Sequence, residues 1–214
     1  NYQDIAYKDQ LLLKSTLLKD TIEHFLPDVL PQLSDIIGCR HTSFHRNKME
    51  FSFGKHQDKL TCGLKEQGSF DRIIPISNCK LLSQQSNLIL QHTIDFFSKT
   101  SVTLWDTHAQ TGSLKQLMIR HSKAFDHYVI SIISATKEPC FSDYANYMMN
   151  HFSTIIGVNL LLDIQKKGQR STTTCIPLKG ELKLKEKINE LVFSISPQSF
   201  FQPNSCLLYT SDAA

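Results

Sequence analysis

The sequence is poor in glycine and contains no long hydrophobic run. Its eight glycines are scattered over 214 residues, so they cannot assemble the glycine-rich loop that binds nucleotide phosphates in many proteins. No stretch of about 18 apolar residues occurs, which excludes a membrane-spanning helix within this sequence. The first residues are polar and lack the basic start and apolar stretch of a signal peptide. We therefore expect a cytoplasmic protein with no membrane partner.

Cysteine pairs with metal-site spacing are also missing. None of the six cysteines forms a C-x-x-C pair, which excludes a complete zinc or thioredoxin motif. Reduced thiols are favoured in a chain of this length, and the commonest role for any one cysteine is a small buried hydrophobic residue. His41 and His45 are spaced i, i+4, but they lie at an expected loop-to-strand junction, which disfavours a metal site.

The sequence does contain enough apolar residues for a core, together with a slight excess of basic charge. Hydrophobic residues make up 41% and charged residues 20%, which favours a folded domain over disorder. The net charge of +3 and the isoelectric point near 8.5 are compatible with an anionic partner but do not require one.

Hydrophobic periodicity switches between the helical and the strand type along the chain. The expected helices span residues 5–26, 83–99 and 142–152, and Ser142 or Asp143 would cap the last of them. The expected strands span residues 47–53, 60–65, 70–76, 102–105, 114–120, 128–135, 157–164, 181–185 and 191–196, with a turn at 54–59 and a polar loop at 166–174. We predict an α+β fold with hairpins, a mixed or antiparallel sheet, packed helices and no repeated βαβ unit.

The clearest strand pattern begins near residue 47 and carries two cations. Apolar residues such as Met49 and Phe51 alternate with polar ones, so one face of the strand would anchor it in a sheet. Arg46 and Lys48 are suited to contact phosphate oxygens of RNA. On spacing alone, a solvated strand face is the more frequent explanation.

Residues 112–120 and 194–204 provide two further candidates. Lys115 and Arg120 are five positions apart, so in a regular strand they face opposite sides, and the pattern indicates little beyond a strand. Phe200 and Gln202 are more unusual, because two aromatic residues followed by an amide and a proline are odd for a core strand. An aromatic ring can stack on an unstacked base, and an amide can pair with a polar ligand edge. A strand end followed by a turn explains these residues equally well.

Taken in order, these segments resemble one family, the S-adenosylmethionine-dependent RNA (uracil-5)-methyltransferases that act on ribosomal or transfer RNA. Residues 46–51 resemble its Y-R-N-K-x-x-F strand, with His45 in place of the tyrosine. Residues 112–120 resemble its G-x-L-R-x-L-x-I-R strand, with Lys115 in place of the arginine, and residues 68–79 resemble the stretch that ends in its last cluster cysteine. Residues 196–204 match its S-P-x-S-F-F-Q-x-N motif, which is the most specific match.

The resemblance implies roles for individual residues. Gln202 would contact S-adenosylmethionine, and Phe200 would lie against the flipped target uracil. The RNA-facing region would include Arg46, Lys48, Lys115 and Arg120. Cys79 would be the fourth ligand of a [4Fe-4S] cluster, with the other three cysteines upstream of Asn1. These roles require Phe200 and Gln202 to face an opening and not a sealed core.

The resemblance also indicates which catalytic parts are missing. In the family a cysteine thiolate adds to C6 of uracil, C5 then accepts the methyl group, and a carboxylate base removes the C5 proton. These groups and the donor loop follow the F-F-Q motif in the family, and Cys206 matches no nucleophile motif. We expect an inactive fragment with no catalytic residue: a central RNA-recognition and cluster domain at 1–190 and a truncated Rossmann-like methyltransferase domain beginning at 191–204. Residues 205–214 resemble translated cloning sequence and are expected to be a non-native tail.

Three hypotheses follow, with a monomer expected. The first is a fragment of an enzyme that methylates C5 of a uridine, with 23S ribosomal RNA preferred over transfer RNA because the Cys79 segment is present. The second is a non-catalytic RNA-binding module, for which the basic balance and the Arg46 and Lys48 strand would suffice. The third is a structural α+β domain, whose binding to RNA would show no salt dependence.

Overall fold

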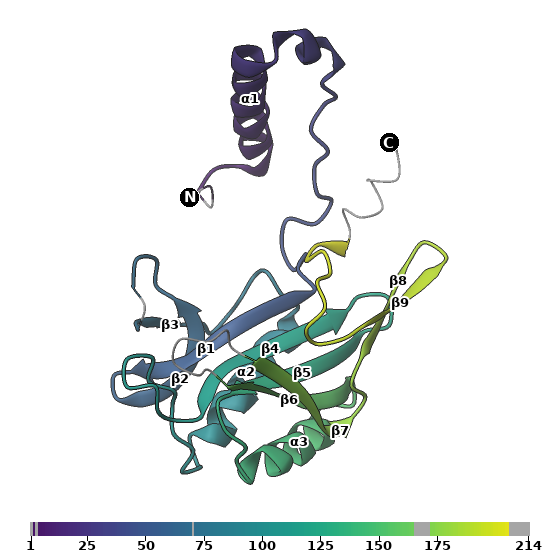
Figure 1. The fold of residues 1–214 in the computed structure, drawn as a ribbon. Coiled ribbons are helices and arrows are strands. Elements are labelled where there is room, and N and C mark those ends of the chain that lie inside the picture. The colour runs from purple at the N-terminus through teal and green to yellow at the C-terminus, as the bar shows by residue number, and fades with distance from the viewer. Residues whose placement is uncertain (1, 3, 70, 165–171, 206–214) are drawn as a thin grey trace. The chain divides into compact units, whose positions relative to one another are not determined.

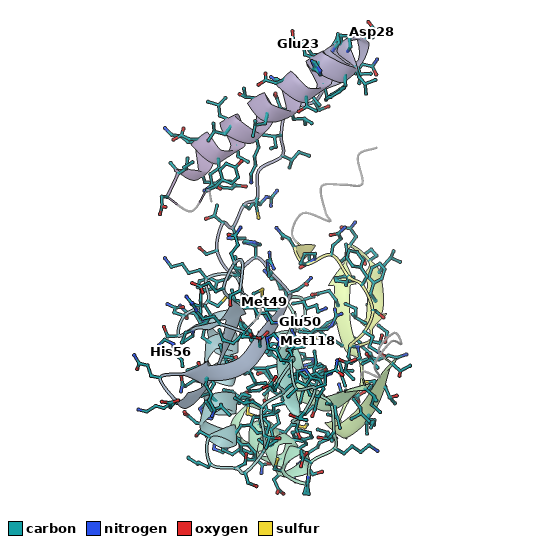
Figure 2. The ribbon with its side chains drawn as sticks, turned by 60° about the vertical axis from the view of Figure 1, so that its left-hand side comes forward. Glu23, Asp28, Met49, Glu50, His56 and Met118 are labelled. Carbon is teal, nitrogen blue, oxygen red and sulfur yellow. The ribbon has the colours of Figure 1, made fainter. Side chains whose placement is uncertain are left out.

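The computed structural model describes residues 2, 4–69, 71–164 and 172–205, and the chain forms two compact units that divide between Thr42 and Ser43. The first unit contains helix α1 (Tyr7–Phe25) and the 3-10 helix η1 (Pro27–Gln32), so the helix predicted at 5–26 is confirmed. Glu23 near the end of α1 and Asp28 in η1 are labelled in Figure 2. No residue of α1 is buried, and Leu12, Leu13, Leu17 and Leu18 are exposed. Among the described residues, no helix is both long and apolar enough to cross a membrane.

The second unit is built on a seven-stranded sheet with strand order β3-β2-β1-β4-β5-β6-β7 (Figure 1). Its strands are β1 (Lys48–His56), β2 (Lys59–Lys65), β3 (Ile73–Pro75), β4 (Leu114–Ser122), β5 (His127–Ser134), β6 (Ile155–Ile164) and β7 (Thr172–Gly180). Neighbouring strands are antiparallel except β5 and β6, which are parallel and are connected by helix α3 (Cys140–His151). A separate hairpin of β8 (Leu184–Ile188) and β9 (Leu191–Ile195) follows. The predicted α+β class and the mainly antiparallel sheet are confirmed.

Helices α2 (Gln84–Phe97) and α3 cover the same face of the sheet (Figure 1). Phe51 of β1 and Leu117 of β4 are cross-strand partners, and both are buried beneath these helices in one apolar core. The helices contribute aromatic rings to this core, and Phe97 stacks on Tyr144 with the ring centres 4.8 Å apart. Burial of this apolar area is the main source of stability in this region.

The hairpin of β1 and β2 forms as expected but has a shorter turn. Strand β1 continues to His56, which is labelled at its far end in Figure 2, so only Gln57 and Asp58 make the turn predicted for 54–59. Both residues have positive φ, at 50° and 60°. This is the backbone of a two-residue type I′ turn, which matches the twist of paired strands.

Other elements differ from the sequence prediction. Helix α3 begins at Cys140 without a side-chain cap, so Ser142 and Asp143 lie inside its first turn and cap nothing. Residues 102–105 contribute only an isolated bridge at Leu104. Strand β7 includes residues expected in a polar loop, and as an edge strand it tolerates Pro177.

The predicted domain boundary at 190 falls in the turn between β8 and β9. Phe70, residues 165–171 and all but Ser205 of the expected tail lie outside the described residues.

Candidate functional site

The predicted recognition motif lies directly after β9 and is open to solvent. Phe200 is 82% exposed, and Gln202 is exposed as well. Phe201 is partly buried, and its ring centre lies 6.0 Å from that of Phe193 in β9. The segment 196–203 therefore presents one strongly exposed aromatic ring and two exposed amides, of which that of Gln198 already donates to the carbonyl oxygen of Thr173. An exposed ring has the accessibility that contact with an unstacked base requires.

Asn47, the residue immediately before β1, holds the end of this segment. Its Nδ2 donates to the carbonyl oxygen of Gln202 at 2.8 Å, and its backbone N–H donates to the carbonyl oxygen of Pro203 at 2.7 Å. The carbonyl of Asn47 in turn accepts from the backbone N–H of His121 at 2.9 Å. Asn47 is only 4% exposed, so its side chain needs such partners to offset the loss of water.

Arg120 of β4 holds the beginning of the same segment. Its Nη2 donates to the carbonyl oxygen of Pro197 at 3.1 Å and to that of Ser199. Arg120 is 3% exposed, and burial lowers the pKa of its guanidinium, which nevertheless remains charged at neutral pH. The expectation that Arg120 contacts RNA is therefore wrong for this structure, because two backbone carbonyls of the chain already occupy its Nη2.

Glu186 of β8 attaches the hairpin that leads into the segment. Its carboxylate accepts from the backbone N–H groups of Lys123 and Ala124 at 2.9 and 3.0 Å, and from the hydroxyl of Ser122 at 3.3 Å. Glu186 is 2% exposed. Sequence reasoning missed this residue, although it shares strand parity with Leu184 and should therefore point inward.

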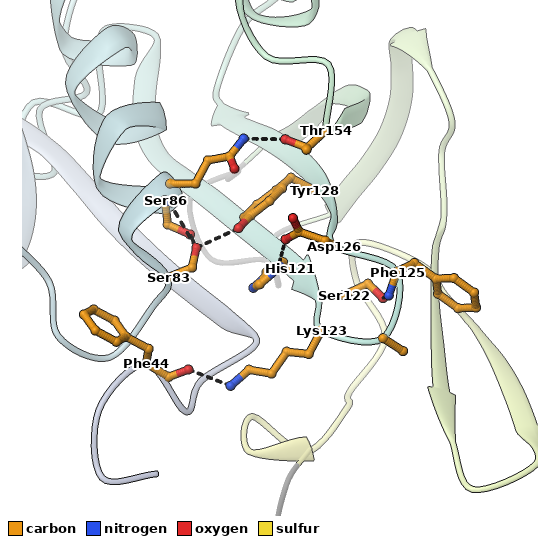
Figure 3. Close-up of polar contacts among 12 residues, drawn as sticks. Phe44, Ser83, Ser86, His121, Ser122, Lys123, Phe125, Asp126, Tyr128 and Thr154 are labelled. Atoms are coloured by element: carbon orange, nitrogen blue, oxygen red, sulfur yellow. Dashed lines mark hydrogen bonds and ion pairs between the residues drawn. The ribbon is translucent and has the colours of Figure 1, made fainter.

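A polar cluster surrounds the turn that Glu186 contacts (Figure 3). His121 Nε2 bonds to Asp126 Oδ1 at 2.9 Å, and the His121 ring stacks on Tyr128 with the ring centres 4.2 Å apart. The Tyr128 hydroxyl bonds to Ser83 Oγ at 2.7 Å. Burial lowers the pKa of His121, an effect that the nearby Asp126 partly opposes. From the sequence, only a polar turn between two strands could be predicted at this cluster.

The two cations predicted on β1 have different surroundings. Arg46 is exposed, and its Nη1 lies 3.4 Å from the sulfur of Met49. Lys48 forms an ion pair with Glu50 at 2.7 Å, and Glu50 is the cross-strand neighbour of Met118 (Figure 2). Lys48 therefore has a carboxylate partner already, whereas the exposed guanidinium of Arg46 is better placed to meet a phosphate.

Lys115 lies toward the opposite end of β4 from Arg120. Its Nζ bonds to Asp163 Oδ2 and to the Asp163 carbonyl oxygen, each at 2.9 Å, and lies 4.3 Å from the centre of the Trp105 ring. These residues line a cavity of about 1050 Å³. The structure therefore does not bring Lys115 together with Arg46, Asn47 and the segment 196–203, and its expected contact with RNA is not supported.

Cys79 is the predicted cluster ligand. It is buried, and its backbone N–H donates to Asn87 Oδ1 at 2.7 Å. Within the described ranges, no three His, Cys, Asp or Glu side chains gather where they could hold a metal. A [4Fe-4S] cluster requires four ligands, so Cys79 and the other described residues alone cannot hold one.

Comparison with known proteins identifies relatives along most of the chain. A scan against protein-family models finds no match. The chain is 25% identical to a protein of Bacteroides thetaiotaomicron over 95% of its own length and 49% of the relative. It is 30% identical to a protein of Nanoarchaeum equitans over 80% of its own length and 37% of the relative. Both are named as uncharacterized RNA methyltransferases. The chain thus spans about half, or less, of the length of the curated relatives it matches.

One solved structure shares the fold. It is the tRNA (uracil-54, C5)-methyltransferase of Pyrococcus abyssi in complex with S-adenosyl-L-homocysteine, with a TM-score of 0.75 and 17% sequence identity. The match covers 98% of this chain and 48% of the other. At this level of identity, the likeness is evidence for the fold.

Proposed function

Because the relatives that match most of the chain are named RNA methyltransferases, we propose that the chain belongs to this family and is the RNA-recognition portion of an enzyme that methylates C5 of a uridine. S-adenosylmethionine is the proposed methyl donor, in line with the product-like ligand named for the structural neighbour. We further propose that the whole protein acts as a cytoplasmic monomer.

The observation that carries this proposal is the exposed Phe200 ring on an anchored segment. Exposed apolar side chains occur singly on many protein surfaces, so exposure alone assigns no partner, and what distinguishes Phe200 is that its exposed ring stands on a fixed backbone. Here the ring is 82% exposed, while the carbonyls of Ser199 and Gln202 on either side are bound to buried side chains. A flipped base is a suitable partner, because it offers a flat face for stacking on an aromatic ring.

In the proposed reaction, this chain binds and orients the substrate. Phe200 stacks on the target uracil, the exposed side-chain amide of Gln202 faces the methyl donor, and Arg46 contacts RNA phosphate. S-adenosylmethionine supplies the methyl group that C5 accepts. The buried Cys62 does not provide the thiolate that would add to C6, because burial raises the pKa of its thiol. We propose that the 214 residues alone do not catalyse turnover.

The proposed RNA target is 23S ribosomal RNA, with transfer RNA as the alternative. The preference rests on the sequence segment that ends at Cys79, which resembles the cluster segment of the ribosomal type. A cluster in the whole protein remains part of the proposal, with Cys79 as one ligand.

A methyl-transfer assay tests the proposed function. The full-length open reading frame is supplied with labelled S-adenosylmethionine and with unmodified 23S ribosomal RNA or transfer RNA, and nucleoside analysis should detect 5-methyluridine. Phe200→Ala should reduce turnover by about 5- to 150-fold, since a stacked base contributes about 1–3 kcal/mol. Leu88→Ala, at an exposed site on α2, is the matched control and should leave turnover unchanged.

Three results would revise the proposal. Turnover by the 214-residue chain alone would overturn its inactivity. Salt-dependent RNA binding by the full-length protein without methylation would favour the non-catalytic RNA-binding module, which rests on the basic balance and the strand that carries Arg46 and Lys48. Methylation of transfer RNA alone would replace the proposed ribosomal target.

A further inference from the structure

We propose that Asn47, Arg120 and Glu186 form a clamp of positioning residues that fixes Phe200 and Gln202 in the orientation in which they meet their ligands. This inference rests on the proposed function for the identity of the ligand, an RNA base. The clamp itself is defined by contacts within the second unit of the chain.

The contacts of the clamp lie before the segment 196–203, at its beginning and at its end. Glu186 attaches the hairpin that precedes the segment 196–203, Arg120 binds the carbonyls of Pro197 and Ser199, and Asn47 binds that of Gln202. Phe200 therefore lies between two residues whose carbonyl groups are both fixed. Its backbone has little freedom although its ring is free in solvent.

Burial of the polar side chains of the clamp costs free energy. A charged or amide group that is nearly inaccessible to water is destabilising unless hydrogen bonds replace its hydration. Among the described residues, Arg120 Nε and Asn47 Oδ1 have no hydrogen-bond partner. The bonds to the segment are therefore the ones that offset the burial of both side chains.

The hydrogen bonds of the clamp are directional, so they define the geometry of the segment that they hold. Hydrophobic packing is non-directional, whereas an N–H to carbonyl bond weakens steeply when it bends. One nitrogen of Arg120 donates to two carbonyls separated by a single residue, and a guanidinium presents its N–H groups in a rigid plane. A lysine ammonium lacks this planar geometry, so Arg120→Lys should not replace the arginine fully.

A double-mutant cycle tests the clamp in the 214-residue chain. The probe is a short, fluorescently labelled, uridine-containing single-stranded RNA, and its affinity is measured over a range of salt concentrations. Phe200→Ala and Arg120→Met should each weaken binding about tenfold, from the loss of one stacked base. The double variant should be no weaker than either single one, because Arg120 acts through Phe200.

The salt dependence separates positioning from direct contact. Arg46→Met should reduce the slope of log affinity against log salt by about one, because it removes a phosphate contact. Arg120→Met should leave the slope unchanged. Additive losses in the cycle, or a reduced slope for Arg120→Met, would overturn the proposal.

Hydrogen exchange provides a readout that does not depend on RNA. Arg120→Met and the second variant, Asn47→Ala, should accelerate exchange of the amides at 198–202 while α2 and α3 remain protected. Thr93→Val is the control, because it removes a buried hydroxyl of α2 that bonds to Tyr144 of α3 and should leave both the segment and RNA affinity unchanged. Unchanged exchange at 198–202 in both clamp variants would overturn the positioning role. Failure of the wild-type chain to bind RNA would count against the proposed function alone.

Discussion

The helix-covered face of the sheet and the segment 196–203 are held in place by opposite means. Beneath α2 and α3, buried aromatic and aliphatic side chains such as Phe97 and Tyr144 pack in one apolar core. The segment 196–203 has little apolar burial, and polar side chains from the sheet and the hairpin hold it. The apolar core supplies stability, whereas the polar contacts supply a defined position for an exposed ring. Substitutions in the two regions should therefore have separable effects on stability and on recognition.

The largest expected effect on stability lies in the apolar core. Phe97→Ala should lower the free energy of unfolding by about 3–5 kcal/mol, because it leaves a cavity beside Tyr144 and Phe53. Denaturant unfolding measures the loss. RNA affinity, measured where the variant is fully folded, should be unchanged. A parallel loss of affinity under those conditions would show that the two regions are coupled.

An intermediate effect is expected where the hairpin joins the sheet. Glu186→Ala should lower the free energy of unfolding by about 1–3 kcal/mol, since the backbone N–H groups of Lys123, Ala124 and Lys187 and the hydroxyl of Ser122 lose this acceptor. Amide exchange at Lys123 and Ala124 should accelerate. Glu190→Ala is the matched control, because Glu190 is fully solvated apart from a long contact with Lys187. Equal losses in the two variants would contradict the role of Glu186.

The smallest expected effect is a pH dependence from His121. Burial lowers its folded-state pKa below the ordinary value of 6.5, so the unfolded chain binds the proton more readily. Stability from this residue is therefore complete above about pH 6.5 and is lost as the pH falls toward the folded-state pKa. His121→Phe keeps a ring on Tyr128 but cannot titrate, so its unfolding free energy should fall less on acidification.

His108 must be separated from His121 in this measurement. Its bond to Asp71 raises the pKa of His108, so it contributes stability at low pH that is lost as the pH rises. The difference in unfolding free energy between wild type and His121→Phe, taken at each pH, cancels the contribution of His108, because His108 is present in both proteins. A steeper acid loss in His121→Phe than in wild type would reverse the sign assigned to His121.

The fold was largely predictable from local pattern, and the exceptions have physical causes. The helix predicted at 83–99 is confirmed as α2, which begins after the N-cap Ser83, whose side chain accepts from the backbone N–H of Ser86. Strand β7 was not anticipated, since a threonine-rich edge strand containing Pro177 lacks the alternation of a half-buried strand. The pairing register of β4 with β5 shifts between Leu114 and Gln116, an irregularity that periodicity does not reveal.

The candidate site was only partly predictable. Exposure of Phe200 and Gln202 agrees with what the sequence motif required. The burial of Arg120 was not foreseeable, because its partner Pro197 lies 77 positions away and no local pattern reports such a contact. The roles of Asn47 and Glu186 likewise depend on partners that lie far away in the sequence. The sequence motif indicated the candidate residues, whereas long-range hydrogen bonds determine which of them are exposed and which hold the segment 196–203 in place.

The sequence separation of the clamp contacts has a consequence for the order of assembly. Asn47 and its partner Gln202 are 155 residues apart, so closing this contact carries a loop entropy that the nearby hairpins do not. During synthesis, β1 and β4 emerge well before residues 196–203. We therefore expect the sheet to form first and to serve as the template on which residues 196–203, with the exposed Phe200 ring, dock afterwards.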